Sequence, residues 1–230
     1  MLNNLKGWFG EKATQAGMWL KLDEHHYRRF HDLIIETKLG TTQIDHVVLS
    51  PYGLFVIETK NYKGWIYGGK DQKFWTQSFG HTKFKFQNPL HQNYKHTMAL
   101  SEFLNIDHDK VVHSIVFFIG EAEFKTEMPP NVLASGLSAY IKTFNNIVFP
   151  YTKFAILEQK LLNLSRNGTI SSKEHVQNLE ERYCNFEICP KCGDVLIQRT
   201  AKKGPNAGSE FMGCSGFPKC RYFKQIDSGL

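Results

Sequence analysis

Residues 44–60 read IDHVVLSPYGLFVIETK, and this stretch decides the fold. Two apolar runs, residues 44–49 and 54–57, flank the sequence SPYG at residues 50–53. A proline at the second position of a tight turn and a glycine closing it are typical of a β-turn. The stretch therefore predicts a hairpin of two buried strands.

The register of this hairpin decides which side chains meet. A turn centred on residues 51 and 52 pairs Asp45 with Glu58, whereas a bulge in the turn would slip the pairing by one residue and exchange the faces. Lys60 lies two residues after Glu58, so both side chains project from one face of the strand. Neighbouring carboxylates favour a hard divalent cation, and an ammonium beside them could orient a water or help to deprotonate it. The set predicts chemistry suited to phosphodiester hydrolysis.

A second acidic pattern with the same spacing lies earlier in the chain, where Asp23 is followed by Glu36 and then by Lys38. Asp23 stands in a polar run with no turn signal before Glu36, so this set lacks a hairpin to hold it. We therefore assign the site to the later set. Spacing alone does not separate the two patterns, and solvated strand ends would explain either one.

The sequence on both sides of the hairpin alternates helical and strand-like patterns. Amphipathic spacing predicts a first helix over residues 7–21, and Asn88 followed by Pro89 predicts the start of a helix that runs to Leu104. Further strands are expected at residues 33–35, 64–67, 73–77 and 111–119, and further helices near residues 135–144 and 151–164. Strands flanked by helices predict an α/β architecture.

Three other patterns have structural interpretations. The polar run that contains His25, His26 and His31 predicts surface histidines. His46 is expected on the strand face opposite Asp45. Lysine and phenylalanine alternate over residues 83–86, and we interpret this as a strand at a sheet edge rather than a stripe that contacts DNA.

Composition limits the class of protein. Of the 230 residues, 41% are hydrophobic and 22% are charged, which is typical of a folded chain. No apolar run is long enough to cross a bilayer and the first ten residues do not resemble a secretory signal, so a cytoplasmic protein is expected. The net charge of +6 permits a nucleic-acid partner but is weak evidence for one.

All 5 cysteines lie after residue 183. In a reducing compartment, an odd number of clustered cysteines favours a metal site over disulfides. Cys189 and Cys192 form one pair of closely spaced cysteines, and Cys214 and Cys220 form a second; each such pair is called a hook below. Four thiolates from two hooks suit a structural zinc ion. A tail too small for its own hydrophobic core normally needs such a metal. Cys184 lies outside both hooks, and its pairing with Cys189 is left open.

Residues 189–193 read CPKCG, and residues 213–222 read GCSGFPKCRY. These strings resemble the C-terminal zinc fingers of bacterial type I DNA topoisomerases, a resemblance that implies binding of DNA, largely single-stranded. Basic side chains suit phosphates and aromatic side chains suit bases, although at least half of the aromatics are expected to pack around the zinc. The residues that we assign to DNA contact are Lys202, Lys203, Phe217, Lys219, Arg221, Tyr222 and Phe223.

Four further stretches carry a second resemblance: GWFGE at residues 7–11, GTTQIDHVV at 40–48, GLFVIETKNYKGWI at 53–66 and NPLHQ at 88–92. Together they resemble the NERD (nuclease-related) domain, which is grouped with the PD-(D/E)xK nuclease superfamily. The resemblance covers roughly residues 7–120. It implies a restriction-endonuclease-like mixed sheet flanked by helices, with the hairpin as the catalytic core.

The NERD resemblance also implies roles for individual residues. Asp45 and Glu58 would hold Mg²⁺ or Mn²⁺, and Lys60 would be the catalytic lysine. Glu11 would be an additional acid near the metal, and Gln92 would contact DNA or order the site. An isoleucine rather than a proline precedes the aspartate, a departure that the family tolerates.

The sequence therefore predicts a metal-dependent DNA nuclease of DNA processing or repair, with a zinc-finger tail. The expected domains are a nuclease-like domain over residues 1–165, a helical linker over 166–184 and a zinc finger over 185–230. The expected partners are other DNA-processing proteins and DNA, which is expected to be single-stranded or structured rather than plain duplex. The protein is expected to be bacterial and associated with the nucleoid. No membrane partner is expected.

The alternative is a non-catalytic DNA-binding protein that uses the nuclease-like fold as a docking module. The intact pair of acids with its lysine favours the nuclease, because two acids facing an anion would weaken binding by a module that only binds.

Overall fold

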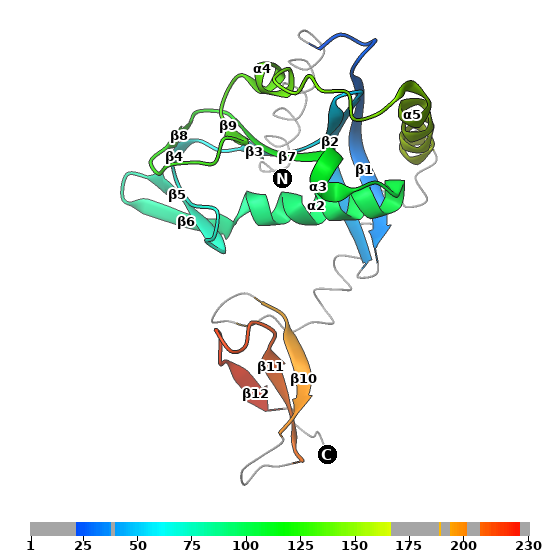
Figure 1. Cartoon of the computed structure of the whole chain (residues 1–230). Coiled ribbons are helices and arrows are strands. Elements are labelled where there is room, and N and C mark those ends of the chain that lie inside the picture. Colours follow the sequence, from blue (N-terminus) through cyan, green and yellow to red (C-terminus); the bar gives the residue numbers. More distant parts are fainter. Residues whose placement is uncertain (1–21, 38–39, 167–188, 190–193, 202–207, 226–230) are drawn as a thin grey trace. The chain divides into compact units, whose positions relative to one another are not determined.

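The computed structural model describes residues 22–37, 40–166, 189, 194–201 and 208–225 (Figure 1). The chain divides into two compact units, Met1–Ser171 and Ser172–Leu230. The predicted first helix and the predicted linker helix lie outside the described residues. No helix in the described part of the chain is both long and apolar enough to span a membrane.

The first unit is built on a five-stranded mixed sheet with the order β1-β2-β3-β7-β9. Its strands are β1 (Arg28–Thr37), β2 (Gly40–Ser50), β3 (Gly53–Asn61), β7 (Val112–Ile119) and β9 (Val132–Leu133). The first three are antiparallel, and β7 and β9 continue the sheet in parallel. The predicted hairpin register is confirmed, because Ser50 pairs with Gly53 and His46 with Ile57.

Helices cover both faces of this sheet, which explains why its central strands are apolar on both sides. Helix α2 (Pro89–Leu104) and helix α5 (Tyr151–Arg166) pack on the face that carries Val47 and Val56. Helix α4 (Leu137–Ile141) packs on the other face (Figure 1). By alternation, the face under α2 is also the face of Asp45, Glu58 and Lys60.

Helix α2 has the bounds and the cap that the sequence predicts. The Asn88 side chain accepts a hydrogen bond from the backbone N–H of Leu90 and donates to the carbonyls of Gly69, Lys70 and Gln72. This buried asparagine therefore caps the helix and fixes the loop that leads toward it. The short helix α3 (His108–Val111) follows and leads into β7.

A second sheet of four strands, with the order β6-β5-β4-β8, lies beside the first. It contains β4 (Gly64–Tyr67), β5 (Phe74–Phe79), β6 (Thr82–Gln87) and β8 (Ala122–Phe124). Trp75 of β5 stacks on Phe118 of β7, with the ring centroids 6.2 Å apart, and this contact joins the two sheets. Strand β6 lies at the edge of its sheet, as predicted from the alternating residues 83–86.

The second unit contains a three-stranded antiparallel sheet of β10 (Leu196–Thr200), β11 (Glu210–Cys214) and β12 (Phe223–Gln225). Its buried cluster consists of Leu196 with Cys189, Cys214 and Cys220. The apolar cluster of the described residues in this unit is small and provides little hydrophobic stabilisation, which favours a metal held by the cysteines as the stabilising element. The mixed α/β fold and the small cysteine-centred ribbon both agree with the sequence prediction.

Candidate active site and zinc centre

The residues predicted for hydrolysis gather where the β2–β3 hairpin faces α2. Asp45 lies on β2 one residue before the His46–Ile57 pair, and Glu58 lies on β3 one residue after it. Lys60 follows on the same face of β3, and Gln92 comes from the first turn of α2. The structure therefore brings four of the predicted residues together, whereas Glu11 lies outside the described residues.

Glu58 is the most deeply buried acid of this cluster, with 3% of its surface exposed. Its Oε1 accepts a hydrogen bond of 2.6 Å from Lys60 Nζ, and its Oε2 lies 3.3 Å from His96 Nε2. Burial alone would raise the pKa of Glu58, but the close approach of His96 and the charge of Lys60 outweigh it and lower the pKa. Glu58 is therefore an ionised carboxylate at neutral pH.

Lys60 Nζ bridges the strand and the helix, because it also donates to Gln92 Oε1 at 3.1 Å. Burial alone would lower the pKa of Lys60, but the negative charge of Glu58 and the hydrogen bond to it raise the pKa instead. The side chain is therefore a charged ammonium in this state. It is suited to stabilising negative charge rather than to acting as a base.

Asp45 differs from Glu58 in its electrostatics. Burial, and then repulsion from Glu58, raise the pKa of Asp45 to about 6, against the hydrogen bonds from Thr59. The backbone N–H and the hydroxyl of Thr59 donate to Asp45 Oδ2 at 2.8 and 2.9 Å. In the described part of the chain, Oδ1 of Asp45 makes no hydrogen bond.

The unsatisfied oxygens of this cluster fit a divalent cation. Glu58 Oε2 is buried and has no well-aligned hydrogen bond, although His96 Nε2 is close to it. Together with Oδ1 of Asp45 it offers two carboxylate oxygens, the ligand type that Mg²⁺ and Mn²⁺ prefer. A cation there would also relieve the repulsion that raises the pKa of Asp45.

Helix α2 is fixed against the sheet by a buried asparagine beside the site. Asn93 Nδ2 donates to the carbonyls of Val56 and Ile115 at 2.9 and 3.0 Å, and to Ser114 Oγ at 2.9 Å. These bonds tie the helix to β3 and β7 directly behind Gln92. These hydrogen bonds therefore fix the part of the helix backbone from which the Gln92 side chain reaches Lys60.

His96 and Thr42 belong to the cluster but were not predicted. His96 lies one helical turn after Gln92 and faces Glu58, and its Nδ1 lies 2.8 Å from Thr42 Oγ1 on β2. The spacing from Gln92 places both side chains on one face of the helix, which is the signal that could have identified His96. For Thr42, the signal is its place in the quoted stretch 40–48.

The earlier acidic pattern does not form a comparable site. Asp23 lies in the turn before β1 and accepts a hydrogen bond from His26, whereas Glu36 is exposed near the other end of β1. The strand between them spans on the order of 25 Å at about 3.3 Å per residue. Lys38 lies outside the described residues. The assignment to the later set agrees with this geometry.

The predicted histidines differ in their exposure. His25 and His26 are exposed as expected, and His46 is buried on the face opposite Asp45. His31 is half-buried rather than fully exposed, because β1 pairs with β2 and sets it opposite His46, with their Nδ1 atoms 2.9 Å apart. Burial, and then the neighbouring His31, lower the pKa of His46 to about 3, so this ring is neutral.

The second unit brings three of the predicted zinc ligands together. The sulfur atoms of Cys189, Cys214 and Cys220 all lie within 4.8 Å of one another, and those of Cys189 and Cys220 are 3.7 Å apart. Thiolates about 2.3 Å from a tetrahedral zinc ion are separated by about 3.8 Å, so this spacing fits the metal. Cys192, the predicted fourth ligand, and Cys184 lie outside the described residues.

A glycine supports the cysteine cluster. The backbone N–H of Gly216 donates to Cys214 Sγ at 3.3 Å, as expected for an amide that stabilises a metal-bound thiolate. A Cβ at this position would lie 2.6 Å from Asp194 Oδ2, so a larger residue would have to displace the Asp194 side chain.

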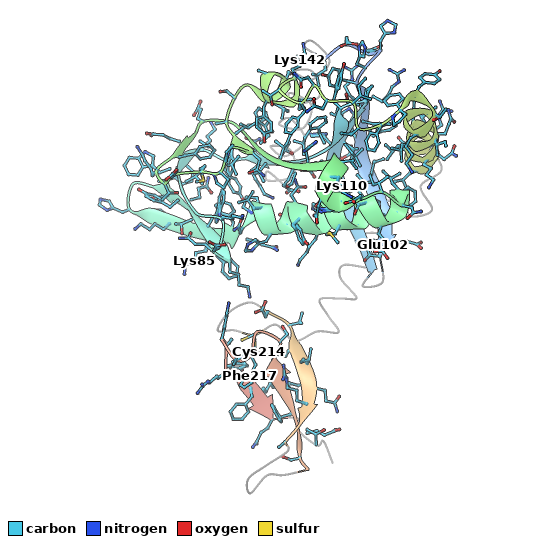
Figure 2. The ribbon with its side chains drawn as sticks, in the orientation of Figure 1. Lys85, Glu102, Lys110, Lys142, Cys214 and Phe217 are labelled. Carbon is cyan, nitrogen blue, oxygen red and sulfur yellow. The ribbon has the colours of Figure 1, made fainter. Side chains whose placement is uncertain are left out.

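The predicted DNA-contact residues of the zinc finger differ in their exposure to solvent. Phe217, Lys219, Arg221 and Phe223 are exposed (Figure 2 labels Phe217 beside Cys214), whereas Tyr222 packs against the cysteine cluster. Tyr222 therefore stabilises the fold at least in part. Lys202 and Lys203 lie outside the described residues.

Comparison with known protein families finds one matching family model for each of the two units. A model described as nuclease-related domain matches residues 6–119, and one described as topoisomerase DNA binding C4 zinc finger matches residues 186–229. The chain joins a NERD domain to a topoisomerase-type C4 zinc finger. The first carries the carboxylate cluster, and the second carries the cysteines.

Curated relatives match one part of the chain each. An uncharacterized protein of Bacillus anthracis is 50% identical over 96 residues, which are 41% of this chain and 45% of that protein. DNA topoisomerase 1 of Methanothermobacter thermautotrophicus is 49% identical over 39 residues, 17% of this chain and 5% of the enzyme. An uncharacterized protein of Escherichia coli is 46% identical over 44 residues, 19% of this chain and 22% of that protein. The chain thus spans less than half the length of each relative. No solved structure matches significantly.

Proposed function

We propose that the NERD domain hydrolyses phosphodiester bonds of DNA with Mg²⁺ or Mn²⁺, and that the zinc finger binds the DNA. The observation that carries the proposal is the buried cluster of two carboxylates and one ammonium, in which Lys60 Nζ lies 2.6 Å from Glu58 Oε1 and Asp45 faces the same side. Clusters with perturbed pKa values are more frequent at catalytic sites than elsewhere in proteins.

The residues of the cluster have different roles in such a reaction. Asp45 and Glu58 would hold the cation, which when bound would lower the pKa of a coordinated water and stabilise the leaving oxygen. Lys60 keeps its proton and offers positive charge to the phosphate as negative charge develops. Gln92 holds the Lys60 ammonium in place from α2. His96, with Thr42 behind it, orients the Glu58 carboxylate.

The zinc finger supplies a surface suited to single-stranded DNA. Phe223 has 62% of its surface exposed, and the Arg199 guanidinium lies 5.8 Å from the centre of the exposed Phe217 ring. Exposed rings can stack on bases, and Arg221 and Lys219 beside them can face phosphates. These contacts support a preference for single-stranded or structured DNA over plain duplex. The proposed setting is DNA processing or repair, together with other DNA-processing proteins.

The test is incubation of the full-length chain with linear, nicked, single-stranded and branched DNA, with Mg²⁺, Mn²⁺ or Ca²⁺. The proposal expects cleavage that requires Mg²⁺ or Mn²⁺. DNA binding with no cleavage of any substrate would instead favour the alternative, a non-catalytic DNA-binding protein that uses the nuclease-like fold for docking. Binding of Mn²⁺ is measured in the same samples. This measurement distinguishes a protein that fails to bind the metal from one that binds it but does not cleave DNA.

A further inference from the structure

The second sheet of the NERD domain packs one face on the core only in part, because Phe79 and Phe84 on that face are 45% and 53% exposed. Its other face is in solvent. Ile66 and Trp75 point inward and pack on β7. On the other face, Trp65, Tyr67 and Phe74 are 42%, 37% and 38% exposed. Three large aromatic side chains on one solvent face of a small sheet are unusual without a binding partner.

The strand register arranges this face in rows. Trp65 on β4 lies opposite Ser78 on β5, which lies opposite Lys83 on β6. In the next row, Tyr67 lies opposite Thr76, which lies opposite Lys85. Because neighbouring strands are about 4.8 Å apart, two aromatic side chains run along one side and two lysines run about 10 Å away.

The small side chains between the two rows and the lysines of the basic row suit a ligand that carries both phosphates and bases. The β5 side chains between the aromatic row and the basic row are those of Thr76 and Ser78, which are small. Ser78 is only 2% exposed, so its neighbours cover it. Neither Lys83 nor Lys85 has an ion-pair partner among the described residues. Figure 2 labels Lys85 on β6.

Further lysines lie against the aromatic rings. Lys125 Nζ lies 4.9 Å from the centre of the Trp65 ring, and Lys73 Nζ lies 5.6 Å from that of Phe74. Glu123, opposite Trp65 on β8, is paired with Lys125. The positive charge of Lys83 and Lys85 is therefore not neutralised by this acid.

We propose that this face binds single-stranded DNA, with bases stacked on Trp65 and Tyr67 and phosphates facing Lys83 and Lys85. An edge strand often carries lysines merely to prevent pairing with other sheets, but that function does not require exposed aromatic rings beside them. Aromatic rings and a track of basic residues at this separation are the elements of single-strand recognition on sheets.

The same register shows which of residues 83–86 belong to the proposed surface. The alternation places Lys83 and Lys85 on the aromatic face, whereas Phe84 and Phe86 point to the other face. The lysines, but not the phenylalanines, are therefore part of the proposed surface. Strand β6 leads directly into Asn88 and α2, so a short continuous segment joins this surface to Gln92 of the carboxylate cluster.

The test measures binding of a fluorescent dT oligonucleotide to the full-length zinc-loaded chain, without Mg²⁺ or Mn²⁺, as a function of salt. The double variant Lys83→Glu/Lys85→Glu is expected to bind at least ten-fold more weakly, with a salt slope smaller by about 1.4 because two phosphate contacts are lost. The double variant Trp65→Ala/Tyr67→Ala is expected to bind roughly ten-fold more weakly with an unchanged salt slope, because stacking is lost.

The matched controls are Lys142→Glu and Tyr151→Ala, which change an exposed lysine after α4 and an exposed aromatic at the start of α5. Both are expected to bind within two-fold of wild type. Ultraviolet crosslinking to the same oligonucleotide should yield labelled peptides that contain Trp65 or Tyr67, in addition to those from the zinc finger. Because binding is measured without cleavage, failure of the nuclease proposal does not affect this result.

Three outcomes would overturn the inference. One is affinity of both double variants equal to that of the controls. Another is loss of self-association in Trp65→Ala/Tyr67→Ala without loss of DNA affinity, which would make the face a protein interface. The third is markedly tighter binding of the matching ribonucleotide, which would assign the face to RNA. Melting temperatures of all variants ensure that weak binding is not unfolding.

Discussion

Lys60 Nζ lies 2.6 Å from Glu58 Oε1, although the two residues belong to the same strand and are separated by one residue. Alternation on β3 directs both side chains toward α2, where Gln92 accepts the second hydrogen bond of the ammonium. Among the described residues, no cation makes such a direct contact with Asp45, the carboxylate on the neighbouring strand. The site therefore holds one neutralised acid and one acid with a raised pKa, and this asymmetry leads to separate predictions.

Asp45→Asn should stabilise the metal-free protein at neutral pH and abolish cleavage. The pKa of Asp45 is raised from 3.8 to about 6 by burial, so the folded protein holds this proton more tightly than the unfolded chain. Ionised Asp45 therefore lowers the stability as pH rises from about 4 to about 6. The substitution should remove a penalty on the order of 2 kcal/mol above pH 6 and none below pH 4.

Urea unfolding of wild type and Asp45→Asn at pH 4, 5, 6 and 7.5 measures this difference directly. Glu36→Gln is the matched control, because Glu36 is an exposed acid on β1. Equal free energies of unfolding for wild type and Asp45→Asn at every pH would show that the raised pKa is absent.

Divalent cations should stabilise the NERD domain through Asp45 and Glu58. A ligand that binds only the folded state at 100 times its dissociation constant adds about 2.7 kcal/mol to the free energy of unfolding. Mn²⁺ should therefore raise the melting temperature of wild type and of Glu36→Gln, but not of Asp45→Asn or Glu58→Gln. Mn²⁺ binding followed by electron paramagnetic resonance provides an independent count of sites. Stabilisation that survives both substitutions would place the metal elsewhere.

Asn93→Ala should weaken both the fold and the site. The substitution removes three hydrogen bonds from the Asn93 amide and leaves the buried carbonyls of Val56 and Ile115 without this donor. Unsatisfied buried groups cost about 1–3 kcal/mol each, so a loss of at least about 2 kcal/mol is expected. Lys95→Ala, an exposed change on the same helix, should have little effect in thermal and urea unfolding. Similar stability of the two variants would contradict this role of Asn93.

The finger should contain one zinc ion per chain. Cys214→Ser should lower the metal content because it removes one of the clustered thiolates, whereas Ser215→Ala, an exposed change beside it, should leave the content unchanged. Cys184→Ser should also retain zinc, since Cys184 is not among the four predicted ligands. Elemental analysis of the purified variants measures this. Loss of zinc in Cys184→Ser but not in a Cys192→Ser variant would show that Cys184, and not Cys192, is the fourth ligand.

The sequence predicted those parts of the structure that depend on local chemistry. The turn at Pro51 and Gly53 and the apolar runs beside it determine the hairpin register, and Asn88 with Pro89 determines where α2 begins. The contact of His31 with His46 was not predicted, because it depends on the pairing of β1 with β2, which residues near His31 do not encode.

Contacts between distant segments account for the other omissions. His96 meets Glu58 only because α2 packs across β3, and the separation of Lys83 from Trp65 depends on β5 lying between them. The cysteines were easier to assign, because pairs of cysteines a few residues apart are a local sequence pattern typical of structural zinc sites.

The central claim is tested most directly by Mg²⁺-dependent cleavage of labelled DNA by wild type, Lys60→Met and Glu36→Gln under single-turnover conditions. Loss of a preorganised charge at a reacting phosphate typically lowers rates by 10²–10³-fold, and a loss of about this size is expected for Lys60→Met. Glu36→Gln should cleave at the wild-type rate. Absence of cleavage by wild type, or equal rates for wild type and Lys60→Met, would contradict the account.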